Sequence, residues 1–146
     1  MRKGIYSVFA AVVLICLFAV SSAKGQSTNR VVLQADIPFE FTVGKVTLPA
    51  GEYTVRSVSD SSDILQLRSA DGHSILVQMN SIIGKADDSA KLIFNRYGNH
   101  YFFTQAWMPA TQTGLEASKP RAERAARREL AGLKPEIAEV ALIARR

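Results

Sequence analysis

The chain has 146 residues, a formal net charge of +5 and a single cysteine, Cys16. This length suits one domain built around one hydrophobic core. The single cysteine excludes a disulfide framework within the chain, so its stability must come from packing.

The N-terminus has the three parts of a cleavable secretory signal. Arg2 and Lys3 supply positive charge, an apolar stretch follows, and small residues end it, so cleavage is expected after Ala23 or after Gly25. A transmembrane anchor is the main alternative, but the apolar stretch is shorter than the ~20 residues that cross a bilayer and has no basic stop after it. We therefore assign residues 1–25 to a signal-peptide helix and expect a periplasmic or extracellular protein without an integral membrane span.

Removal of this signal changes what the composition implies. Cys16 leaves with it, so the mature chain is cysteine-free, and Ile15 before Cys16 is not the small residue that lipid attachment needs. Arg2, Lys3 and Lys24 also leave, which lowers the net charge from +5 to +2. The basic character of the whole chain therefore says little about its partners, and nucleic acid is not expected among them.

The first part of the mature chain has the pattern of half-buried strands. Apolar residues occupy the odd positions from Val31 to Val43, which is the period of two typical of a strand with one buried face. Pro38 cannot donate to a strand ladder, so we expect two strands with a break near Asp36. Gly44 and Lys45 then form a turn, and after a second tight element over residues 48–51 the strand pattern resumes.

Two hairpins follow a polar loop over residues 59–63. Asp71 and Gly72 separate two alternating runs over residues 65–79, and Gly98 and Asn99 separate residues 91–97 from residues 101–107. Between the hairpins, an irregular connection is expected over residues 82–89. Residues 26–109 are therefore predicted to be a mainly β domain, either an antiparallel β-sandwich or a small open barrel.

The composition changes after Pro109. Residues 110–118 are predicted to be a linker, and residues 119–133 an amphipathic basic helix capped by Ser118. Its inward face is expected to hold Ala122, Ala126, Leu130 and Leu133, an alanine stripe that buries little area, while Glu123 pairs with Arg127 one turn away. Residues 134–146 form a strand or a second helix, and their β-branched residues favour a strand with Val140 and Leu142 facing inward and Glu139 outward.

One stretch of sequence resembles a known family. The run Ile37–Gly44 (IPFEFTVG) followed by Leu48–Val55 (LPAGEYTV) is similar to a family of small exported bacterial β-domain proteins with no established activity. The resemblance implies a secreted or periplasmic β domain, and it transfers no catalytic residue, cofactor or ligand.

Residues that could carry chemistry are few. His73 and His100 each follow a predicted hairpin turn, where an exposed polar residue is ordinary, so no zinc site is expected. Two acidic pairs lack the ligand spacing of a calcium loop, so we expect no metal and no cofactor; they are Asp60 with Asp63, and Asp87 with Asp88. No catalytic sequence motif is visible, so we predict that the protein is not an enzyme.

Two groups of side chains are candidate binding surfaces. The first is a set of aromatic residues near the second hairpin, most of which we expect in the core: Tyr97, Tyr101, Phe102, Phe103 and Trp107. The second is the set of arginines on the predicted helix, which could meet lipid headgroup phosphates but are diluted by Glu116, Glu123 and Glu129: Arg121, Arg124, Arg127 and Arg128.

The sequence therefore predicts an exported, non-enzymatic β domain that binds or supports an envelope component, either a glycan or a protein. Two alternatives stay open. One is an envelope glycan hydrolase that uses scattered carboxylates, and the other is a peripheral membrane protein held by the arginine-rich helix.

Overall fold

The structure is a computed structural model that describes residues 32–58, 64–84, 89–109, 112–130 and 134–144. It is mainly β, as predicted. The strands are β1 (Leu33–Ile37), β2 (Phe41–Val43), β3 (Val46–Leu48), β4 (Gly51–Ser57), β5 (Ile64–Ser69), β6 (Ser74–Ile83), β7 (Lys91–Tyr97), β8 (His100–Trp107), β9 (Thr113–Ala117), β10 (Glu136–Ala141) and β11 (Ile143–Ala144). The helix α2 spans Arg121–Glu129.

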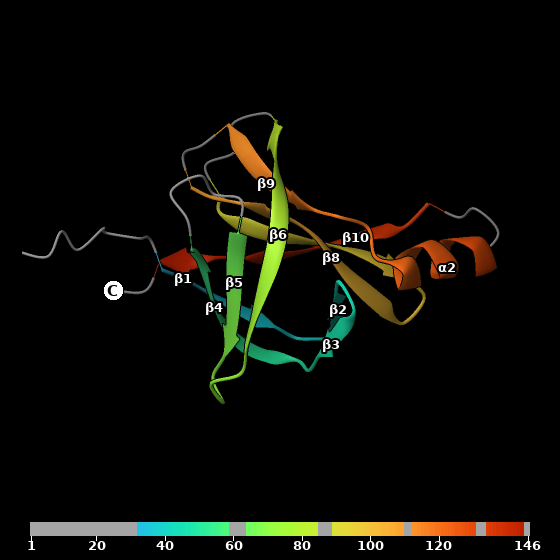
Figure 1. Cartoon of the computed structure of the whole chain (residues 1–146), viewed down its shortest axis with the longest axis horizontal. Helices are drawn as coiled ribbons and strands as arrows, with labels where there is room; N and C mark the ends of the chain where they lie inside the picture. The colour runs from blue at the N-terminus through green and yellow to red at the C-terminus, as the bar shows by residue number, and fades with distance from the viewer. Residues whose placement is uncertain (1–31, 59–63, 85–88, 110–111, 131–133, 145–146) are drawn as a thin grey trace, which may run out of the picture.

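The strand order in the sheet is β10-β7-β8-β9-β6-β5-β4-β1-β11. The long strand β6 connects its two halves, β10-β7-β8-β9 and β5-β4-β1-β11. The first half of β6 pairs with β5 and its second half pairs with β9. At the other side β10 pairs with β7 and β11 pairs with β1, and only Leu142 separates these two short strands. Figure 1 shows β4, β5 and β6 side by side, with β8 and β10 crossing behind them toward α2.

The predicted break at Pro38 and both predicted hairpins are confirmed. β1 ends at Ile37 and β2 begins at Phe41, with the odd-numbered residues of both strands buried. The β7–β8 hairpin turns on Gly98 and Asn99 alone, because Tyr97 pairs directly with His100. One pairing is parallel rather than antiparallel: after the break, β2 pairs with β8, whereas β1 pairs with β4.

Six aromatic rings from four strands and one loop form an aromatic core, in which Phe39 and Tyr101 are partly buried and the other four rings are buried. The ring of Phe41 lies 5.3 Å from those of Tyr53 and Phe94, edge to face in both cases, and Phe39 stacks on Tyr101 at 3.8 Å. Phe94 also contacts Phe39 and Phe103. Such pairs stabilise beyond the apolar area that they bury.

The Tyr53 hydroxyl links the core to the turn before β4, where it donates a 2.6 Å hydrogen bond to the carbonyl of Pro49. Three aromatic residues of the IPFEFTVG and LPAGEYTV stretches, Phe39, Phe41 and Tyr53, therefore belong to this aromatic core. The aromatic residues of these stretches therefore help to hold the fold together.

Two segments predicted to be irregular are strands. Residues 113–117, inside the predicted linker, form β9 between β6 and β8. Residues 82–83, in the predicted connection, are the end of β6 and pair with Gly114 and Thr113. Gly114, Leu115 and Ala117 of β9 are buried, so this strand lacks the alternation that identifies a half-buried one. The C-terminal strand is confirmed, with Val140 and Leu142 buried and Glu139 exposed.

Trp107 fills a narrow space between two glycines at the end of β8. A Cβ atom on Gly114 would lie 2.8 Å from Cδ2 of the indole, and one on Gly84 would clash with Cη2. Neither contact is possible for a real Cβ atom, so both positions need glycine while the indole lies there. The indole Nε1 donates to the Gln105 side chain at 3.1 Å.

The helix packs differently from the prediction. α2 starts after Pro120, which takes the N-cap position without a side-chain cap, and it ends at Glu129. Ala122 is exposed, and the buried residue of the helix is Glu123, with 2% of its surface accessible. The predicted inward face is wrong at Ala122, while Ala126 and Leu130 are half-buried and Leu133 lies outside the described residues. The helix sequence alone does not reveal that Glu123 meets polar partners on β7.

Candidate functional site

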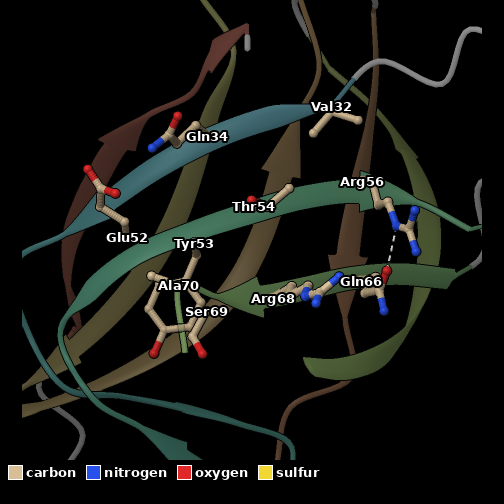
Figure 2. A pocket seen from close by; sticks show the side chains of 10 residues that line it. All are labelled: Val32, Gln34, Glu52, Tyr53, Thr54, Arg56, Gln66, Arg68, Ser69 and Ala70. Carbon is tan, nitrogen blue, oxygen red and sulfur yellow. Dashed lines mark hydrogen bonds between the residues drawn. The ribbon is translucent and has the colours of Figure 1, made fainter. Parts of the chain in front are cut away.

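The outer face of β1, β4 and β5 forms a hollow of ≈ 450 Å³. Ten residues line it, and Figure 2 shows their side chains: Val32, Gln34, Glu52, Tyr53, Thr54, Arg56, Gln66, Arg68, Ser69 and Ala70. Because strand residues alternate between the two faces of a sheet, the outward positions of these strands lie over the core that their inward neighbours build. We call this surface the strand face.

Strand pairing sets the arrangement of the polar side chains. Gln34 lies opposite Thr54, and Thr54 lies opposite Arg68, so one row crosses all three strands. In the next row Arg56 lies opposite Gln66, and the Arg56 Nε donates to the Gln66 Oε1. The strand face therefore offers amide, hydroxyl and guanidinium groups at fixed positions.

Charge is distributed unevenly over the strand face. Arg56 and Arg68 lie on one part, while Glu52 pairs across the strands with Asp36 at the other. Among the described residues, the Arg68 guanidinium has no hydrogen-bond or ion-pair partner.

Tyr53 lines the hollow but turns its ring into the core, where 2% of the residue is accessible. Burial raises the pKa of its hydroxyl above the usual value, and the negative charge of Asp71 adds to this. The phenol is therefore a neutral structural donor at physiological pH.

A second polar cluster lies where α2 meets the sheet. The Asn95 Nδ2 donates to Glu123 Oε1 at 2.8 Å, and the Tyr97 hydroxyl donates to the same oxygen at 3.5 Å. The other oxygen, Oε2, is buried and has no partner among the described residues. Burial raises the pKa of Tyr97, and the nearby Glu123 charge raises it further while Arg127 opposes this.

The residues singled out in the sequence are dispersed. His73 and His100 are exposed at two different turns, and in the described part of the chain no three potential ligands gather in a metal-binding group. Three surface hollows contain one carboxylate each, which are Glu52, Glu116 and Glu136. The two Asp pairs and the cleavage positions Ala23 and Gly25 lie outside the described residues.

The aromatic set is mostly interior, as expected. Tyr97, Phe102 and Phe103 are buried, whereas Tyr101 and Trp107 are half-buried. The four helix arginines Arg121, Arg124, Arg127 and Arg128 are all exposed. No helix in the described ranges has the length and apolar character needed to cross a membrane.

The strand face is the site that sequence reasoning missed. Its arginines and amides appear in the sequence as ordinary outward residues of alternating strands, and the pairing of β4 with both β1 and β5 that brings them together leaves no local signal. In comparisons with known proteins, no family model, curated protein or solved structure matches the chain.

Proposed function

We propose that the protein is an exported, non-enzymatic binding module of the bacterial envelope, and that the strand face holds its ligand, an envelope glycan. The observation that carries this proposal is the gathering of Gln34, Thr54, Arg56, Gln66 and Arg68 in one hollow. Polar groups on paired strands are already in position before binding, so little ordering entropy is lost when a ligand docks.

The architecture supports a rigid platform of this kind. β6 belongs to both halves of the sheet, and β10 and β11 are one bent strand that reaches β7 and β1. We infer from this continuity a small barrel-like sandwich, in which the strand face is one outer wall.

Export is tested by fractionation of the native cells, with the intact mass measured in each fraction. A species beginning at Lys24 or Gln26 in the periplasm or the medium supports export and cleavage. A species that keeps residues 1–25 in the membrane fraction contradicts them.

Glycan binding is tested with isolated envelope polysaccharides and the purified protein, with binding followed by calorimetry. Gln34→Ala removes an amide from the strand face and is expected to weaken binding several-fold. Asn80→Ala is the matched control, because Asn80 is an exposed amide on β6 outside the hollow. Equal affinities for both variants would place the ligand elsewhere.

The burial of Glu123 favours a second candidate function, peripheral association with anionic lipid. With this glutamate turned inward, α2 exposes four arginines and only one carboxylate, Glu129. The helix is therefore more basic toward solvent than its sequence implies, and each basic residue near an anionic surface contributes roughly 1 kcal/mol.

Deleting the C-terminal region cannot test this candidate, because it would also remove β10 and β11 from the sheet. We instead replace Arg121, Arg124, Arg127 and Arg128 with Gln and measure co-sedimentation with vesicles of phosphatidylglycerol and of phosphatidylcholine. Loss of binding to the anionic vesicles alone supports the candidate, whereas unchanged sedimentation excludes it.

A further inference from the structure

We infer that the ligand of the strand face is an acidic glycan, held through its carboxylate groups by Arg68 and Arg56; this rests on the proposed binding function. Arg68 is the centre of the argument. Its guanidinium lies in the hollow with no partner among the described residues, so its donors are available to a ligand. A guanidinium presents parallel N–H groups that match the two oxygens of a carboxylate, and such charge-assisted pairs are stronger than neutral ones.

Arg56 supplies a second, oriented cation. Its Nε donates to the Gln66 Oε1, which orients the guanidinium, and its two terminal nitrogens have no hydrogen-bond partner among the described residues. Arg56 lies opposite Gln66, two residues from Arg68 along β5, so the two arginines are diagonal neighbours. Their Cα atoms are therefore about 7–8 Å apart, close enough for both to act on one acidic sugar or on adjacent ones.

Neutral groups beside the arginines suit sugar hydroxyls. Gln34 and Thr54 continue the row of Arg68 across β4 and β1, and they can both donate and accept hydrogen bonds. The pair Glu52 and Asp36 at the opposite end repels a carboxylate. A bound acidic chain is therefore placed with its charges on the arginine side.

The residues that line the hollow offer no exposed aromatic ring on which a neutral sugar could stack. Tyr53 is the one aromatic residue that lines it, and its ring is buried in the core with its hydroxyl bonded to Pro49. The lining therefore offers charge and hydrogen bonds instead of a ring for stacking. A ligand that carries negative charge gains more from this surface than an uncharged one of the same size.

The test compares polygalacturonate with its fully methyl-esterified form, which has the same backbone and no charge. We expect the purified protein to bind the acid at least tenfold more tightly than the ester in calorimetry at low salt. Arg68→Gln should remove most of this preference. Arg124→Gln, which makes the same charge change on the exposed face of α2, should leave it intact.

The other outcomes separate this inference from the proposed function. Equal binding of acid and ester overturns the acidic specificity while glycan binding stands, and binding of neither overturns both. A preference lost in Arg124→Gln but kept in Arg68→Gln assigns the charge effect to α2 and overturns the inference. Binding of polyglutamate as tight as that of polygalacturonate shows that carboxylates are recognised without the sugar, which also overturns it.

Discussion

Replacement of Gly114 by alanine tests how Trp107 is held. The new methyl would lie 2.8 Å from two indole atoms, about 1 Å inside normal carbon contact. The ring cannot move far sideways, because Gly84 limits the space at its other end. The indole must therefore turn outward, and overpacking of this kind costs about 1–3 kcal/mol of unfolding free energy.

The measurement uses the fact that Trp107 is the single tryptophan of the chain. Gly114→Ala should shift the fluorescence maximum to longer wavelength as the indole enters water, and it should lower the Tm by roughly 4–12 °C. Retention of the wild-type emission spectrum and Tm would refute the packing argument.

A Trp107→Ala background shows whether the indole causes the loss of stability in Gly114→Ala. The backbone of Gly114 does not have a positive φ, so alanine there is strained by the indole and not by its own conformation. In a Trp107→Ala background, Gly114→Ala should be neutral or should stabilise by about 0.4–1 kcal/mol, because alanine restricts the unfolded chain. The same loss in both backgrounds would show that some contact other than the indole excludes the methyl group.

Three further predictions concern the hydroxyls and the buried carboxylate. Tyr53→Phe removes the hydrogen bond to Pro49 and should lower the unfolding free energy in urea by about 1 kcal/mol, with the ring still packed. Glu123→Ala leaves the Asn95 and Tyr97 donors unpaired and should cost about 1–3 kcal/mol, whereas Glu123→Gln should cost less because its carbonyl still accepts. Because burial raises the pKa of Tyr53 and Tyr97 in the folded state, the stability that they contribute is complete below about pH 10 and declines as the pH rises through their folded pKa values. Urea unfolding at increasing alkaline pH should show this decline, and Tyr97→Phe should reduce it; an identical pH profile in that variant would contradict the assignment.

The hairpins could be predicted from sequence because their signals are local. Gly98 and Asn99 supply turn residues between two alternating runs. Pro38 has no N–H to donate to a strand ladder, so β1 ends before it. β9 could not be predicted, since Gly114, Leu115 and Ala117 are all buried and the strand shows no alternation.

The strand face depends on non-local pairing, which the sequence does not display. Arg56 and Arg68 are visible as outward residues of alternating strands, but nothing in the sequence specifies which strand lies beside β4. The role of Glu123 is hidden for the same reason, because Asn95 and Tyr97 reach it from β7. Local signals therefore predict many of the elements, and the candidate functional surfaces require the pairing.

The bent strand formed by β10 and β11 has a consequence for the order of events during synthesis. β1 is made first and β7 later, yet each receives a neighbour from residues 136–144, which are made after both. Until then both strands have unpaired edges that can add a strand from another chain. The growing chain is therefore open to self-association at both strands until residues 136–144 have been made, and these residues cover both edges together.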